Sequence, residues 1–131
     1  REDLEKAKRA HPAAKVLAHP ECPREVRALA DFVGSTSQMV KAARELGARE
    51  YVVATEVGLL HRLAKLGVEA HPASPYAVCP DMKKITLESV ARSILEGREV
   101  VRIDPRVAEM ARRAIERTFE LLGVVAPWQR S

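Results

Sequence analysis

A polar motif with the sequence HPEC, residues 19–22, directly follows the apolar run at residues 16–18. It brings an imidazole, a carboxylate and a thiol to the end of one predicted strand. His19 and Glu21 lie two positions apart, so on an extended segment they share a face and can act as a general acid and base. Pro20 restrains the backbone and favours an extended conformation at His19. A turn with a surface histidine and a helix-start glutamate explains the same residues, and the motif alone leaves both interpretations open.

The sequence GSTS at residues 34–37 forms a second group, between a predicted strand at residues 32–33 and a helix that begins near Gln38. Free N–H groups at a helix N-terminus, together with hydroxyl groups, favour the binding of phosphate or carboxylate. Ser35 or Thr36 can instead be a simple helix cap. The preceding glycine and the position at a strand end favour the anion site.

The chain has two cysteines, Cys22 and Cys79, which are too few for a disulfide framework. Cys79 precedes a proline in a predicted loop, and a rigid, accessible thiolate of this kind is typical of iron–sulfur ligands. A buried free cysteine that packs as a small apolar side chain is the alternative. Zinc is less favoured than iron, since the available ligands match no short zinc spacing. Those ligands are His19, Cys22, His71 and Cys79.

Three other ionisable residues have no assigned role. Glu56 follows the predicted strand at residues 51–54 and either faces the same crevice or caps the next helix, so it is left unassigned. His11 and His61 have helical surroundings, and we expect them to be structural or solvated.

Glycines end four segments that have the apolar spacing of an amphipathic helix, as expected for left-handed C-cap residues. These glycines are Gly47, Gly67, Gly97 and Gly123. Each segment predicts one buried stripe, within residues 39–46, 59–66, 87–94 and 107–115.

Short β-favouring runs alternate with these helices, which predicts parallel strands joined by right-handed crossovers. The predicted fold class is α/β, a three-layer α/β/α sandwich with a short parallel sheet. Asp104 and Pro105 indicate the start of a long last helix. The predicted strands are residues 16–18, 32–33, 51–54, 68–70 and 100–103.

With 131 residues, 47% of them hydrophobic, the chain can bury one sizeable core. The net charge of +4 arises from 22 basic and 18 acidic residues that are interleaved, and aromatic residues make up 4%, so a nucleic-acid partner is not expected. No run is long and apolar enough to span a membrane, and the start lacks a signal-peptide pattern, which predicts a cytoplasmic location. Because residue 1 is Arg1, we expect a longer parent protein.

Four ordered segments together resemble quinolinate synthase: residues 16–23, 30–37, 54–63 and 71–87. That family has three similar α/β/α domains around a pseudo-threefold axis, with a 4Fe-4S cluster and the active site where the domains meet. The resemblance implies that this chain is the end of the second domain and the third. The expected organisation is residues 1–14 as the helix that ends the preceding domain, 15–103 as the α/β/α domain, 104–123 as the C-terminal helix and 124–131 as a tail.

The resemblance implies the condensation of iminoaspartate (iminosuccinate) with dihydroxyacetone phosphate to quinolinate, phosphate and water, on the route to NAD. The partners it implies are these two substrates and the N-terminal two domains of the same protein. It further implies that Cys79 is one of three cluster ligands, while Cys22 is not a ligand.

The same resemblance assigns His19 and Glu21 to substrate contact and proton transfer, with Pro20 between them. It assigns Thr36 to a substrate carboxylate or phosphate, and Ser35 and Ser37 are its less certain neighbours. A non-catalytic module that binds a phosphorylated metabolite at residues 34–37 is the alternative function, and a zinc-binding regulatory domain is the third.

Overall fold

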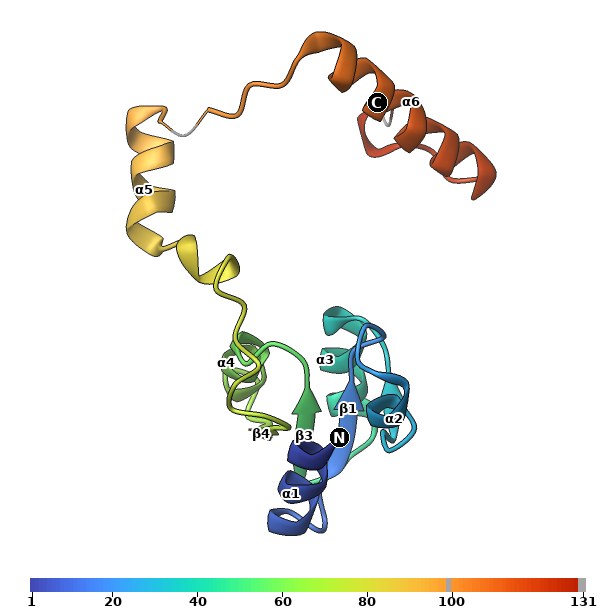
Figure 1. The fold of residues 1–131 in the computed structure, drawn as a ribbon, viewed down its shortest axis with the longest axis vertical. Helices are drawn as coiled ribbons and strands as arrows, with labels where there is room; N and C mark the ends of the chain where they lie inside the picture. The colour runs from blue at the N-terminus through green and yellow to red at the C-terminus, as the bar shows by residue number, and fades with distance from the viewer. Residues whose placement is uncertain (99, 130–131) are drawn as a thin grey trace. The chain divides into compact units, whose positions relative to one another are not determined.

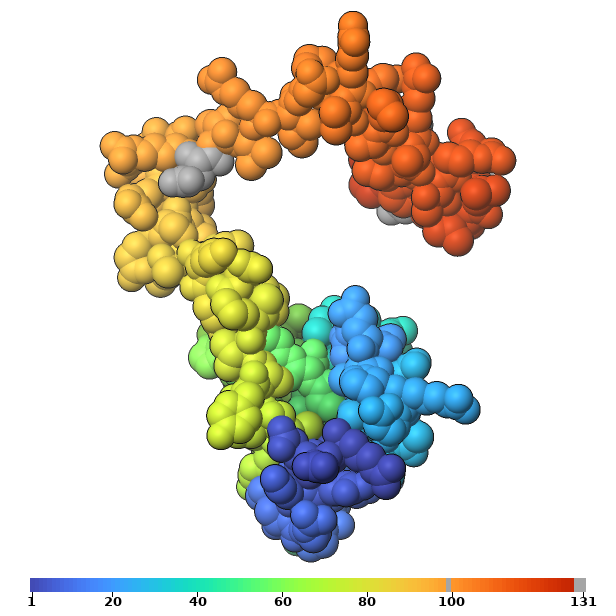
Figure 2. All heavy atoms as spheres, viewed as in Figure 1, coloured from blue at the N-terminus to red at the C-terminus, as the bar shows by residue number. Residues whose placement is uncertain are grey.

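The computed structural model describes residues 1–98 and 100–129, and it divides the chain into two compact units, Arg1–Lys84 and Ile85–Ser131 (Figure 1). The first unit holds the sheet, and its segments pack into one body in the space-filling view (Figure 2). Its elements are α1 (Glu2–Ala10), β1 (Lys15–Ala18), α2 (Arg24–Arg27), β2 (Phe32–Val33), α3 (Thr36–Glu45), β3 (Glu50–Ala54), α4 (Gly58–Ala64), β4 (Glu69–Pro72) and a 3-10 turn (Met82–Lys84).

Four parallel strands form the sheet in the order β2-β1-β3-β4. Strands β1 and β3 are apolar and buried over most of their length, as expected where helices cover both faces of a sheet. In register, Ala18 pairs with Val33 on one side and with Ala54 on the other. The carboxyl ends of β2, β1 and β3 therefore align at one edge of the sheet.

Two separate clusters of buried side chains show that both faces of the sheet are covered. Leu17, Tyr51 and Val53 point to one face, where α3 and α4 pack. Val16 and Val52 point to the other face, where α1 and α2 pack. This alternation along each strand is the physical basis of the three layers, and the predicted α/β/α sandwich with a short parallel sheet is confirmed.

The polar group of one core residue is fully satisfied. Tyr51 has no exposed surface, and its hydroxyl donates to the carbonyl oxygen of Ala43 at 2.8 Å. The same hydroxyl accepts from the Ala48 N–H at 3.1 Å. Because a buried hydroxyl without partners is costly, these bonds fix the end of α3 against β3.

The predicted helix ends are confirmed, since the four glycines named above all have a positive φ between 61° and 72°. The predicted strands of the first unit are also present, although β4 begins and ends slightly later than the run at residues 68–70. Among residues 1–98 and 100–129, no helix has both the length and the apolar character needed to cross a bilayer.

The second unit contains α5 (Leu87–Glu96), α6 (Pro105–Leu121) and a 3-10 turn (Pro127–Gln129). The predicted strand at residues 100–103 is wrong, because this stretch has no regular structure and, within the described residues, no strand pairs with it. The predicted buried stripes of α5 and α6 are also not buried. Leu87 is 81% exposed, Ile94 77% and Val107 56%.

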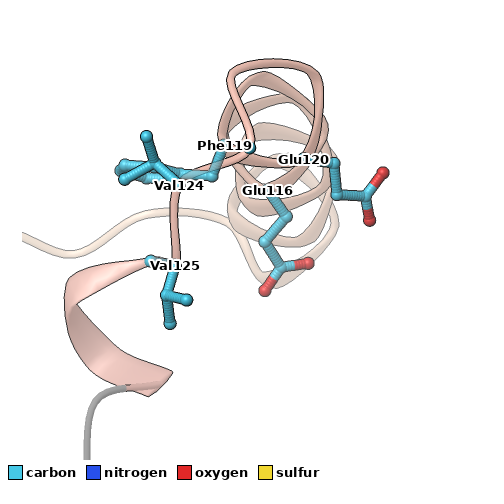
Figure 3. Close-up of a pocket in the computed structure, with 7 residues that line it drawn as sticks. Glu116, Phe119, Glu120, Val124 and Val125 are labelled. Carbon is cyan, nitrogen blue, oxygen red and sulfur yellow. The ribbon is translucent and has the colours of Figure 1, made fainter.

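The tail after α6 folds back on that helix. The Val124 N–H donates to the Phe119 carbonyl at 3.0 Å, and Trp128 meets the Phe119 ring edge-on at a centroid distance of 5.6 Å. A hollow of about 320 Å³ lies between the end of α6 and residues 123–126 (Figure 3). Its labelled polar side chains, Glu116 and Glu120, project from the helix. The hollow contains none of the predicted site residues.

Candidate functional site

The predicted chemical residues follow the carboxyl ends of the four strands. His19 and Glu21 follow β1, Thr36 follows β2, Glu56 follows β3 and Cys79 lies in the loop after β4. Because neighbouring strands are about 4.8 Å apart, the edge from β2 to β4 is about 14 Å long. Crevices at this edge of parallel sheets are where ligands bind, since loops and helix N-termini converge there. The sheet order therefore places the predicted groups along one edge.

Backbone contacts hold His19 at the end of the sheet. Its N–H donates to the Ala54 carbonyl at 3.0 Å, which extends the pairing of β1 and β3 by one residue. The Glu21 N–H donates to His19 Nδ1 at 3.3 Å. Because Nδ1 accepts a hydrogen bond, the neutral ring carries its proton on Nε2. Nε2 is therefore the atom of His19 that donates a hydrogen bond to a ligand when the ring is neutral.

The Glu21 carboxylate is free to move. Its Oε2 lies 3.7 Å from His19 Nδ1, and the side chain is 90% exposed, whereas that of His19 is 27% exposed. A carboxylate this exposed keeps its hydration in the free protein. It can therefore turn towards a substrate or towards a protonated His19.

Cys22 lies beside the same strand end. Its thiol donates to the Ala54 carbonyl with Sγ 3.1 Å from the oxygen. The thiol also borders a cavity of about 250 Å³ under α1 and the loop after β4, whose lining includes Thr55, Ser74 and Ala77. Within the described residues, Cys22 and Cys79 do not belong to one metal-ligating group.

The turn after β2 is built by close packing. A side-chain carbon at Gly34 would come within 2.7 Å of the Phe32 ring, so only glycine fits at this position. Ser35 is the N-cap of α3, since its hydroxyl accepts from the Gln38 N–H at 3.4 Å while the Gln38 side chain accepts from the Ser35 N–H at 2.8 Å. The sequence favoured an anion site over a helix cap for this group, and the structure shows that the alternative, a helix cap, describes Ser35.

Thr36 is the first residue of α3, next to this cap. A capping box satisfies the N–H groups of the cap and of the third helical residue, which leaves those of Thr36 and Ser37 directed out of the helix. Unpaired N–H groups at the positive end of a helix dipole attract an anion. The arrangement can bind a carboxylate or phosphate through Thr36 without using Ser35.

Glu56, which the sequence left unassigned, connects the end of β3 to the segment that follows Cys79. Its Oε1 lies 2.9 Å from Lys83 Nζ, and its Oε2 accepts from the Gly58 N–H at 2.7 Å. The bond with Lys83 contributes most to holding the pKa of Glu56 below its ordinary value, and the Gly58 and Cys79 N–H groups act in the same direction. The carboxylate is therefore charged at neutral pH and anchors this loop.

Two backbone bonds complete that anchor. The Val57 N–H donates to the Ala77 carbonyl at 2.9 Å, and the Lys83 N–H donates to the Cys79 carbonyl at 3.2 Å. These bonds fix the backbone at Ala77 and at Cys79 itself, and Cys79 is half-buried. Glu56 and Lys83 are 27 positions apart, and no periodic pattern in the sequence predicts that they pair. The nearest sequence clue is Gly58, where a side-chain carbon would lie 2.6 Å from the Glu56 carboxylate.

The four residues that were considered as a zinc set do not come together among the described residues. His71 lies in β4. Its side chain instead groups with those of His11 and Glu50, near the opposite end of the sheet. His11 was expected to be structural or solvated, and it is half-buried with its Nδ1 3.0 Å from Glu50 Oε2. Sequence reasoning missed this group because its members are far apart in the chain.

Comparison with known proteins gives a consistent result. The family model for NadA, quinolinate synthetase A protein, matches residues 1–120. The quinolinate synthase of Caldicellulosiruptor saccharolyticus is 45% identical over 123 residues, which cover 92% of this chain and 41% of that protein. The quinolinate synthase of Pyrococcus furiosus is 43% identical over 122 residues, which cover 92% of this chain and 40% of that protein. The chain thus spans about two fifths of the length of these relatives.

Proposed function

The chain belongs to the quinolinate synthase family, and we propose that it supplies part of the active site that makes quinolinate for NAD biosynthesis. The reaction would condense iminoaspartate with dihydroxyacetone phosphate and release phosphate and water. One observation supports this proposal more than any other. Four segments occur along the chain in the order expected for the family, and the proposed site residues in them follow the carboxyl ends of adjacent parallel strands.

In this proposal His19 and Glu21 move protons. In the neutral ring, His19 Nε2–H donates a hydrogen bond to the substrate while Nδ1 accepts from the Glu21 N–H. To transfer a proton, the ring takes one on Nδ1 in place of the Glu21 N–H bond, the Glu21 carboxylate 3.7 Å away balances the positive charge, and Nε2 then gives its proton to the substrate. Glu21 can also take a proton from a substrate carbon or oxygen directly, since its carboxylate is exposed. Pro20 limits the backbone freedom of the pair.

Thr36 would bind the anionic end of a substrate. Both proposed substrates carry negative charge, as carboxylates or as a phosphate, and the start of α3 offers N–H groups and a hydroxyl. Such donors do not need to reorganise when charge develops on the substrate. In this proposal Ser35 holds the helix start in place, and Ser37 adds a neighbouring donor.

Cys79 is proposed as one ligand of a 4Fe-4S cluster. The residue fits this role because its thiol is half-buried on a loop, is followed by Pro80, and has backbone anchors nearby. A cluster with an open iron would supply a Lewis acid that helps a hydroxyl group leave as water. One thiolate does not hold a cluster, so the other ligands would come from the N-terminal two domains of the longer protein.

The domain assignment belongs to the same proposal. Residues 1–14 would end the preceding domain, residues 15–103 would form the third α/β/α domain, and residues 104–123 and 124–131 would form its C-terminal helix and tail. A cytoplasmic location is part of the same proposal.

The decisive experiment compares Cys79→Ser with Cys22→Ser in the full-length protein, purified without oxygen. We expect Cys79→Ser to lose most of its iron and acid-labile sulfide, because a missing thiolate leaves one iron without a protein ligand. Cys22→Ser is the matched control, and we expect it to keep the iron content of the parent. Equal iron content in the parent and in Cys79→Ser would refute the ligand assignment.

The runner-up function is a non-catalytic module that binds a phosphorylated metabolite at residues 34–37. The outward N–H groups at the start of α3 favour it as much as they favour substrate binding. Colour separates the two, since a cluster protein is brown under anaerobic conditions and a simple binding module is colourless.

A further inference from the structure

Three metal-ligating side chains from separate parts of the chain meet near the amino end of the sheet. His11 follows α1, Glu50 is the first residue of β3, and His71 lies in β4. His11 Nδ1 lies 3.0 Å and His71 Nε2 lies 3.3 Å from the same carboxylate oxygen, Glu50 Oε2. The two rings stack with their centroids 3.6 Å apart. A group assembled from positions 39 and 21 residues apart is a product of the tertiary fold.

The distances within this group suit a small divalent ion. Zinc lies about 2.0–2.1 Å from imidazole nitrogen and carboxylate oxygen in a tetrahedral site, so its ligand atoms are about 3.4 Å apart. The two nitrogen-to-oxygen distances are close to this value. All three ligand atoms lie within 4.8 Å of one another, and the two stacked rings are inclined at 14°, so one ring must turn about its χ2 before both nitrogens point at a single ion. Two imidazoles and one carboxylate are also a donor set that zinc prefers.

One ligand atom lacks a partner. His71 Nε2 is buried and makes no hydrogen bond to any residue that the structure describes, despite its short contact with Glu50. A buried polar atom in this state is costly, and a bound cation would satisfy it. Glu69, with its Oε1 3.6 Å from the same nitrogen and its side chain 68% exposed, is placed to act as a fourth ligand or to orient the ring.

The group is also accessible. A cavity of about 440 Å³ opens beside it, and His11 and His71 both line this cavity. Asp3 and Lys6 line it as well, so its wall carries one acidic and one basic side chain. An ion can therefore reach the ligands without unfolding of the strands, and a water molecule can complete the coordination.

We propose that His11, Glu50 and His71 form a zinc site that fastens the end of α1 to β3 and β4. The site is distinct from the carboxyl-edge site, because the four steps from Glu50 to Ala54 separate the two by about 13 Å. A metal that binds only the folded chain adds its binding free energy to the stability of the fold. The ion is therefore structural and does not take part in proton transfer at His19.

The test measures zinc directly. Full-length protein is stripped with a chelator, dialysed against buffered zinc and analysed by mass spectrometry for metal per chain. The parent is compared with Glu50→Gln, with His11→Asn and with the matched control His61→Asn, whose histidine is exposed on α4. We expect the parent and the control to bind one zinc more per chain than Glu50→Gln and His11→Asn, whose affinity falls at least about tenfold. Zinc should also raise the Tm of the parent and the control only.

Each outcome decides the proposal. Equal zinc content and equal Tm shifts in the parent, Glu50→Gln and His11→Asn would overturn the proposal. A parent that binds no zinc after stripping and dialysis would overturn it too. Glu50→Gln conserves shape, and His11→Asn changes a residue outside the strands, so one variant remains informative if the other does not fold. Iron content is not part of the readout, so failure here leaves the proposed enzyme function untouched.

Discussion

The two ends of the sheet each carry a histidine–carboxylate group, and the two groups differ in how the chain builds them. At the carboxyl edge, His19 and Glu21 are two positions apart, His19 Nδ1 lies 3.7 Å from Glu21 Oε2, and the Glu21 side chain is 90% exposed. At the amino end, Glu50 meets His11 at 3.0 Å, and its carboxylate is 21% exposed. The open pair is suited to moving protons at a substrate. The enclosed group is suited to holding the fold, with or without an ion.

The largest expected effect follows from replacing the open carboxylate. We expect Glu21→Gln in the full-length enzyme to lower kcat by about 10²–10⁴-fold, the usual contribution of a general acid or base. Iron content should stay at the parent level, because Glu21 is not proposed as a ligand. The measurement is anaerobic turnover together with iron analysis. Glu25→Gln, an exposed carboxylate on α2, is the control. Turnover equal to that of the parent in Glu21→Gln would contradict the role proposed for the open pair.

A second prediction separates the two ends by stability. We expect Glu50→Ala to lower the free energy of unfolding by about 1–3 kcal/mol in metal-free buffer, because it removes the hydrogen-bond partner of His11 and the carboxylate that lies 3.3 Å from His71 Nε2. Glu21→Ala should change it by no more than about 0.5 kcal/mol, since the side chain is almost fully exposed. Urea unfolding of both variants measures the difference. Similar losses for the two would remove the distinction between an open and an enclosed group.

A smaller effect concerns the start of α3, where two adjacent hydroxyl residues have different tasks. We expect Thr36→Ala to raise the KM for substrate about fivefold, which corresponds to about 1 kcal/mol for one hydrogen bond. Ser35→Ala should instead lower the free energy of unfolding by about 1 kcal/mol, because it removes the N-cap. Steady-state kinetics and urea unfolding of both variants test the division. A loss of stability confined to Thr36→Ala would reverse the assignment.

The smallest effect concerns the Glu56–Lys83 pair, which is partly open to solvent at Lys83. The pKa of Glu56 lies below its ordinary value of about 4.3, so the pair stabilises the fold above that pH and stops doing so as pH falls through the lowered pKa. We expect Glu56→Gln to lower the free energy of unfolding by up to about 1 kcal/mol at pH 7. The difference should disappear in acid. A difference that is independent of pH would show that the charge of Glu56 does not matter.

The features that the sequence predicted well are local. Apolar runs of three or four residues located β1 and β3, and glycine at the end of an amphipathic segment located the helix ends, because only neighbouring residues determine these patterns. The motif at residues 19–22 and the turn at residues 34–37 follow strand ends for the same reason. Their common placement at one edge then followed from parallel pairing.

The features that escaped prediction depend on residues far apart in the chain. The run at residues 100–103 has β-favouring side chains but no strand beside it among the described residues, and strand propensity without a pairing partner does not make a strand. The group of His11, Glu50 and His71 forms because α1 ends where β3 and β4 begin to pair, and no spacing in the sequence encodes that meeting. The same holds for Glu56 and Lys83.

The exposed apolar faces of α5 and α6 have a consequence for handling the isolated chain. Side chains such as Leu87, Leu95 and Met110 are more than 70% exposed on amphipathic helices. Large apolar side chains exposed in this way promote self-association. Solutions of the isolated chain should therefore sediment faster as concentration rises, bind the dye ANS, and disperse again in mild detergent.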